Sequence, residues 1–154
     1  GHRIPFLARW PKQIEAGSSS NETICLTDLL KTCAAMNGVD VPGSAGEDSY
    51  NILPALVGSS SSTPIREATI STAGNGAFSV RQGRWKLELT GSTGGYGNIS
   101  QEEVAAQGLP PVQLYDLEND IGETNNLYAE YPDVISRLTS LLESYREKGR
   151  STRL

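Results

Sequence analysis

The chain has 154 residues, 37% of them hydrophobic and 20% charged, a balance typical of a globular protein with a buried core. Its net charge of −5 argues against a nucleic-acid-binding protein, which would need a basic face. The sequence contains no apolar run of roughly 18 residues that could span a membrane, and its first residues lack the apolar core of a signal peptide.

The first half of the chain predicts one strand, one helix and turn-rich connections. Residues 3–10 carry apolar side chains on both sides, which is typical of a strand covered on both faces in a parallel sheet. Such a strand needs neighbours, so we expect part of the protein to precede this chain. A helix is predicted over 27–37, because Thr27 can cap its first turn and Gly38 can end it. Its apolar residues recur at helical spacing: Leu29, Leu30, Cys33 and Met36.

In the second half, apolar and polar residues alternate in the manner of strands. The predicted strands are residues 66–72, 77–82, 84–90 and 112–117. Between the second and the third, Gln82-Gly83 can form a two-residue hairpin turn, since glycine adopts a positive φ readily. We therefore expect an antiparallel meander of three or four strands.

The strongest helix signal is the run 131–149, where Pro132 fits the first helical position and Asp133 the first turn. Its apolar residues form one stripe: Val134, Leu138, Leu141, Leu142 and Tyr145. This stripe can cover one face of the meander. The residues alone therefore describe an α+β protein.

The acidic segment LYDLENDIGETNNLY, residues 114–128, could be a metal loop or a turn. Asp116, Glu118 and Asp120 match the spacing of the first ligands of a calcium loop. The glycine, however, falls one position late, and Leu127 stands where such a loop needs a bidentate glutamate. We therefore predict a strand end followed by a turn, and no metal site.

Other candidate groups favour structural interpretations. The glycine-rich segment 91–98 lacks the Lys-Ser/Thr of a phosphate-binding loop, and no helix is expected after it. Cys25 and Cys33 would be separated by about 12 Å on one helix, too far for a disulfide, so two buried free thiols are predicted. Taken alone, His2 is either incidental or part of a shared site, and Arg3 is an ion-pair partner or an anion contact.

Five segments share their order and spacing with one known family: GHRIPFLARWP, CLTDLLKTCAAMNGVDVP, AGEDSYNILPALVG, RQGRWKLEL and QLYDLENDIGETNNLY. Over residues 1–150 the chain resembles the C-terminal part of type I sulfatases, the arylsulfatase-like members of the alkaline-phosphatase superfamily. The G-x-R-x-P opening and the L-Y-D-L…D-x-G-E-x-x-N-L closing segment are the most specific parts of the resemblance. Departures occur in two loops, at Lys12, where the family often has glycine, and at Ile121, where it often has proline.

The resemblance implies two domains. Residues 1–64 would be the end of the α/β catalytic domain and would include the strand 3–10 and the helix 27–37. Residues 65–154 would be a C-terminal subdomain, in which a three- to four-stranded antiparallel sheet is packed by a long C-terminal helix. In this family the subdomain packs against the catalytic domain and helps to shape the substrate cleft.

The implied reaction is the hydrolysis of a sulfate ester to an alcohol and inorganic sulfate. The complete enzyme would use calcium and a formylglycine made within a C/S-x-P-S-R motif. That motif is absent here, because Cys25 is followed by LTDL and Cys33 by AAMN. We therefore expect no catalytic residue, no metal ligand and no bound cofactor in this chain, and no activity from the chain alone.

The resemblance implies few substrate contacts. His2 and Arg3 are expected beside the substrate, and Asn75 and residues 91–98 beside its organic part. The expected partners are the upstream catalytic domain of the same protein and a sulfated small molecule or glycan, in an extracytoplasmic compartment that is periplasmic or secreted.

Two alternatives remain open. The chain could be a stand-alone, non-catalytic module that binds a sulfated glycan or a protein partner with the face of the meander. Arg81, Arg84 and Lys86 would serve the glycan, although a solvated outer strand face explains the same residues. It could also be part of a related phosphatase or phosphonate hydrolase, because this sequence lacks the nucleophile motif that would separate these activities.

Overall fold

A computed structural model describes residues 3–59, 62–94, 97 and 99–152 of the chain. The chain divides into two compact units: Gly1–Glu67 together with Lys148–Leu154, and Ala68–Glu147. We call the first the split unit and the second the sheet unit, and describe each by itself. Within the described residues, no helix combines the length and the apolar character needed to cross a membrane.

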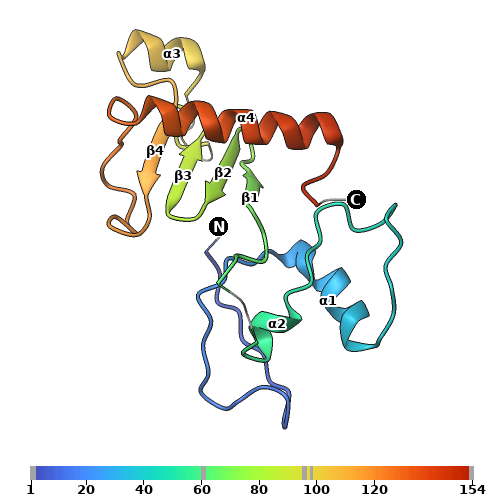
Figure 1. Cartoon of the computed structure of the whole chain (residues 1–154). Helices are drawn as coiled ribbons and strands as arrows, with labels where there is room; N and C mark the ends of the chain where they lie inside the picture. Colours follow the sequence, from blue (N-terminus) through green and yellow to red (C-terminus); the bar gives the residue numbers. More distant parts are fainter. Residues whose placement is uncertain (1–2, 60–61, 95–96, 98, 153–154) are drawn as a thin grey trace. The chain divides into compact units, whose positions relative to one another are not determined.

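The sheet unit contains a four-stranded antiparallel meander in the order β1-β2-β3-β4, as the alternating sequence predicts (Figure 1). Its strands are β1 Thr69–Thr72, β2 Phe78–Gln82, β3 Trp85–Glu88 and β4 Gln113–Asp116. The hairpin turn lies one residue later than predicted, because Gln82 pairs with Trp85 and leaves Gly83 and Arg84 as the turn residues. Gly83 has a φ of 58°, in the left-handed region that glycine tolerates.

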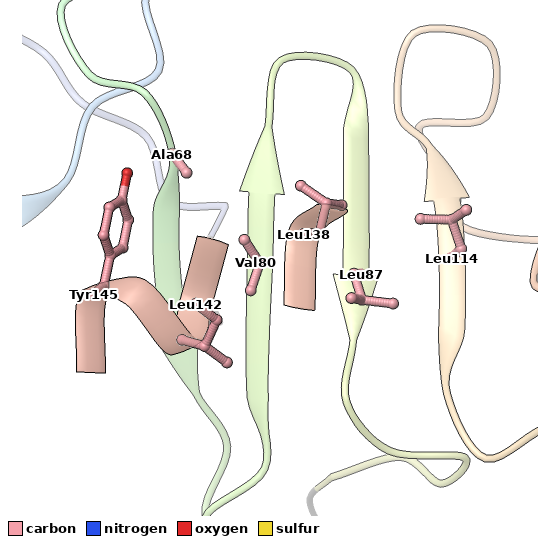
Figure 2. Close-up of a cluster of buried hydrophobic side chains, with 7 residues drawn as sticks. All are labelled: Ala68, Val80, Leu87, Leu114, Leu138, Leu142 and Tyr145. Atoms are coloured by element: carbon pink, nitrogen blue, oxygen red, sulfur yellow. The ribbon is translucent and has the colours of Figure 1, made fainter. Parts of the chain in front are cut away.

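Helix α4, Pro132–Lys148, covers one face of this sheet with the predicted apolar stripe. Val80 pairs with Leu87, and Leu87 with Leu114, so the side chains form one row across three strands. Helical spacing places the buried side chains of α4 against this row (Figure 2): Leu138, Leu142 and Tyr145. Together with Ala68, they form the hydrophobic core of the sheet unit.

The sheet unit also contains helix α3, Gln101–Ala106, where we expected no helix. It begins with a capping box, in which Glu103 N donates to the Ser100 hydroxyl at 3.1 Å and Ser100 N donates to the Glu103 carboxylate at 2.8 Å. Val104 is almost fully buried, with 1% of its surface exposed. The expectation was wrong because the S-x-x-E spacing, and not the glycine-rich segment before it, marks the helix start.

The helices of the split unit are η1 Leu26–Asp28, α1 Leu29–Met36 and α2 Leu53–Leu56. Together, η1 and α1 confirm the helix predicted over 27–37. The strand predicted over 3–10 is wrong, because this segment forms no strand and its Leu7 is 94% exposed. A strand needs a neighbour for its hydrogen bonds, and the described residues pair only within the sheet of β1 to β4.

The end of the chain belongs to the split unit, although the predicted boundaries group it with the sheet. Ser151 N donates to Asp48 Oδ1 at 2.9 Å, and the Tyr50 hydroxyl donates to Ser151 O at 2.7 Å. The Thr152 hydroxyl donates to Glu47 O at 2.8 Å. The tail is therefore bound to the loop before α2 by side-chain hydrogen bonds from both segments.

Candidate functional site

The acidic segment begins at the end of β4 with Asp116, whose carboxylate is bound by Arg84 from the hairpin turn. Arg84 Nε donates to Asp116 Oδ1 at 2.8 Å, and Arg84 Nη2 donates to Oδ2. Asn119 Nδ2 donates to the same Oδ2 at 2.8 Å. The hydrogen bond from Arg84 is the main reason that the pKa of Asp116 is lowered to about 2. Both carboxylate oxygens are thus engaged by protein groups.

Asp120 organises the turn that follows. Its carboxylate accepts from Asn125 N at 2.8 Å and from Thr124 N at 2.7 Å, and the bond from Asn125 is the main reason that the pKa of Asp120 is lowered. Glu123 adopts a φ of 57°, in the left-handed region that non-glycine residues occupy rarely. These hydrogen bonds confirm the turn predicted for the acidic segment.

Glu123 also neutralises a lysine on the sheet face opposite α4. Lys86 adjoins Leu87, whose side chain faces the core, so alternation directs Lys86 to the other face. Its Nζ lies 2.8 Å from Glu123 Oε2 and 2.6 Å from Glu88 Oε1, and 3% of its surface is exposed. The solvated outer face predicted for Lys86 is therefore wrong, because the left-handed turn brings a carboxylate against it. With Arg84 paired to an aspartate as well, the basic patch of the binding-module alternative is largely neutralised.

In the split unit, Asp28 is the centre of a buried polar cluster. Arg66 Nη1 donates to both of its carboxylate oxygens at 2.8 Å, and Cys25 N and Tyr50 N donate to it at 2.7 and 3.0 Å. The Arg66 guanidinium also lies 4.8 Å from the centre of the Tyr50 ring. A buried carboxylate needs compensation for its lost hydration, and these contacts supply it. They also hold three separate segments of the chain around one side chain. The cluster is structural, and no sequence motif indicated it.

The predicted substrate contacts belong to different parts of the chain. His2 lies outside the described residues, and Arg3 is an exposed residue of the split unit. Asn75 belongs to the sheet unit, where its Oδ1 accepts from Ala77 N at 3.0 Å and so shapes the β1–β2 turn. Within residues 91–98, positions 95, 96 and 98 also lie outside the described residues. Substrate contact by these groups stays a prediction.

The described side chains do not fit the cofactors of a sulfatase. Among residues 3–59, 62–94, 97 and 99–152, no three His, Cys, Asp or Glu side chains are grouped as a metal ion requires. The oxygens of Asp116 and Asp120 are engaged instead by an arginine and by backbone N–H groups. The prediction of two buried thiols is wrong, because Cys25 is half-buried and Cys33 is exposed. Helix α1 directs the side chain of Cys33 outward. A calcium and formylglycine centre therefore has no donor set in this part of the chain.

No protein-family model matches the chain, but several curated proteins do. An N-acetylgalactosamine-6-O-sulfatase of Bacteroides thetaiotaomicron is 28% identical over 96% of this chain and 28% of its own length. A Ulvan-active sulfatase of Formosa agariphila is 32% identical over 93% of this chain and 32% of its own length. The human N-acetylgalactosamine-6-sulfatase is 28% identical over 96% of this chain and 31% of its own length. The chain thus spans less than a third of the curated relatives that it matches.

Solved structures also match this chain over only part of their own length. One, from work on glycosaminoglycan metabolism by Bacteroides thetaiotaomicron, superposes with a TM-score of 0.60 at 28% identity, over 78% of this chain and 24% of that one. Another, solved with its substrate D-glucosamine-2-N,6-O-disulfate, superposes with a TM-score of 0.65 at 25% identity, over 90% of this chain and 27% of that one. The sheet and the long helix therefore recur as one part of larger proteins.

Proposed function

Because the chain is homologous to the C-terminal part of the sulfatases, we propose that it is the C-terminal portion of an enzyme that hydrolyses sulfate esters to an alcohol and inorganic sulfate. The observation that carries the proposal is the extent of the alignments, which cover 93% to 96% of this chain in these three relatives. In the complete enzyme this portion completes the fold and shapes the substrate cleft.

The nucleophile and the metal ligands then belong to the part of the enzyme that this chain lacks. Two observations support this division: the C/S-x-P-S-R motif is absent, and the carboxylates of the acidic segment are committed to a turn. Calcium and formylglycine are therefore proposed for the complete enzyme only. The chain alone should be inactive, because the C/S-x-P-S-R motif that would carry the formylglycine nucleophile is absent from it.

A sulfated small molecule or glycan is the proposed substrate. The names of the relatives support the saccharide class, since they refer to N-acetylgalactosamine 6-sulfate and to ulvan. His2 and Arg3 are proposed to line the cleft near the sulfate, where a cationic side chain would stabilise the negative charge. An extracytoplasmic location is proposed on the same family grounds.

The test is to express the complete gene and to measure sulfate release from aryl sulfates, sulfated monosaccharides and sulfated polysaccharides. The complete protein should release sulfate, and residues 1–154 alone should release none. Hydrolysis of phosphate or phosphonate esters without any sulfate release would support the related-hydrolase alternative instead. His2→Ala in the complete enzyme should lower activity, and unchanged activity on every sulfate would remove His2 from the site.

A further inference from the structure

Strands β3 and β4 are neighbours in the sheet, yet a long connection, residues 89–112, joins them. A short hairpin turn suffices to join antiparallel neighbours, and long connections in compact proteins are commonly binding loops on a rigid scaffold. Helix α3 accounts for part of this connection, but the glycine-rich segment precedes that helix. The excursion therefore favours a binding role for the glycine-rich segment over a simple link between strands.

Gln113, the first residue of β4, fixes the start of this connection. Its Nε2 donates to Thr90 O at 2.9 Å and to Ser92 O at 3.0 Å, so both amide hydrogens are used. Its Oε1 accepts from the Tyr115 hydroxyl at 2.6 Å, and this bond sets which way the amide faces. One side chain of the sheet thus binds two backbone carbonyls of the connection.

Ser92 holds the same region from within the connection. Its N–H donates to Thr90 Oγ1 at 3.1 Å, and its hydroxyl accepts from Ile99 N at 2.9 Å. Gly91 packs so tightly that a Cβ on it would collide with the Pro110 carbonyl. The start of the glycine-rich segment is therefore fixed by hydrogen bonds and by close backbone packing.

The segment then meets the turn between β1 and β2, because alternate connections of a meander lie at the same end of the sheet (Figure 1). Gly94 has a φ of 70°, and a Cβ on it would lie 3.0 Å from the Ala73 Cβ. In the turn, Asn75 Oδ1 accepts from Ala77 N, which fixes the plane of the amide. Asn75 is exposed, and none of the described residues accepts from its Nδ2. An oriented and unused donor thus lies next to the glycine backbone.

We propose that Gln113 is a positioning residue that holds residues 91–94 beside Asn75, so that Asn75 and Gly94 form a rim that binds the saccharide part of the substrate. The inference rests on the proposed function and adds the residue that sets the geometry of this contact. The hydroxyl oxygens of a saccharide accept from an amide N–H, and a glycine backbone lets a sugar ring approach closely. Gln113 acts through the segment and needs no contact with the substrate itself.

The test is kinetic and uses the complete enzyme. Gln113→Glu keeps the shape of the side chain but replaces its Nε2 donor with a carboxylate oxygen, which repels the carbonyls of Thr90 and Ser92. Gln107→Glu makes the same chemical change at an exposed position of the same connection and is the matched control. The saccharide probes are N-acetylgalactosamine 6-sulfate and ulvan, and the aryl probe is nitrophenyl sulfate, which has no sugar ring.

We expect Gln113→Glu to raise KM for the saccharide about tenfold, the effect of losing roughly one hydrogen bond, and to leave kcat within about twofold. Its kcat/KM for nitrophenyl sulfate, and every constant of the control, should stay within about twofold of the wild type. Tyr115→Phe removes only the hydroxyl that orients the amide and should show a smaller rise of the same kind. This variant carries the test if Gln113→Glu does not fold.

An equal loss of activity on the saccharide and on the aryl sulfate would overturn the proposal, because a purely structural residue would affect both. An unchanged KM for the saccharide in the folded variants would overturn it as well. Sulfate release from nitrophenyl sulfate alone by the wild type would reject the saccharide rim and leave the sulfatase function standing. No release from any probe by the wild type would reject the proposed function, and the rim with it.

Discussion

The two units of this chain differ in what dominates their interior: a hydrophobic cluster in the sheet unit, and in the split unit a polar cluster beside the fully buried Ile52. In the sheet unit, Leu87 and Leu138 are fully buried, whereas in the split unit Asp28 and Thr32 are buried and Leu30 is 53% exposed. Each large apolar side chain that is buried stabilises a fold by about 1.5–3 kcal/mol, and a buried ion pair contributes much less because its desolvation offsets the attraction. The comparison teaches that the sheet unit supplies its own hydrophobic core, whereas the split unit is held largely by polar contacts and leaves several large apolar side chains exposed.

The buried ion pair offers the largest expected effect. Arg66→Ala leaves the Asp28 carboxylate buried without its cation, which should cost about 3–5 kcal/mol. Hydrogen exchange read by mass spectrometry should show faster exchange in the split unit and unchanged protection in the sheet unit. Arg9→Ala, at an exposed position of the same unit, is the control and should change neither. Equal loss of protection in both units would contradict the conclusion that this ion pair stabilises the split unit alone.

The core of the sheet unit provides the reciprocal test. Leu138→Ala removes a fully buried side chain of α4 and should destabilise the sheet unit by about 2–5 kcal/mol, because the cavity closes only in part. Urea unfolding gives the loss, and Ser140→Ala, at an exposed position of the same helix, should cost little. A loss as small as that of the control would mean that α4 does not hold the core.

A smaller effect is expected at the start of α3. Ser100→Ala removes the hydroxyl that caps Glu103 N and should cost about 1 kcal/mol, confined to α3. Exchange of the amides of residues 103–106 measures it, and Ser136→Ala, on an exposed part of α4, is the control. Loss of protection throughout the β-strands would contradict this expectation. It would show that α3 and the strands unfold as one cooperative unit.

The smallest effect is a pH dependence at Asp116. Folding lowers the pKa of this carboxyl from 3.8 to about 2, so its stabilisation is fully present above pH 3.8 and is lost as the pH falls toward about 2. Solvent screening keeps the effect small, since 42% of the Arg84 side chain is exposed. Urea midpoints measured across this range should fall more for the wild type than for Asp116→Asn. Parallel curves for the two proteins would show that the Arg84 pair does not contribute.

Local patterns predicted most of the sheet unit. The four strands follow from alternation of apolar and polar residues, and α4 from its terminal residues and its apolar stripe, because each signal lies within one element. Even so, α3 was missed, although the Ser100 to Glu103 spacing carries its start signal. The hairpin turn was displaced by one residue, since pairing register depends on both strands.

The split unit was predicted less well for a physical reason. The helical spacing of Leu29, Leu30, Cys33 and Met36 predicted an apolar stripe correctly, but a stripe does not say whether this chain or another surface covers it. The strand at 3–10 failed for the same reason, since strands depend on partners. Asp28 and Arg66 lie 38 residues apart, so no local pattern could have paired them. For the site, the turn at Asp116 was predicted and confirmed, whereas contacts of His2 and Arg3 with substrate remain predictions.

The hydrogen bonds between the tail and the loop before α2 also set an order of assembly during synthesis. The ribosome makes the chain from the N-terminus, so Asp48 and Tyr50 leave it about a hundred residues before Ser151, the residue that each of them binds. Every strand of the sheet unit and helix α4 are complete before Ser151 emerges. The split unit therefore begins before the sheet unit and finishes after it, because its loop at Asp48 and Tyr50 gains these partners only when the tail has been made.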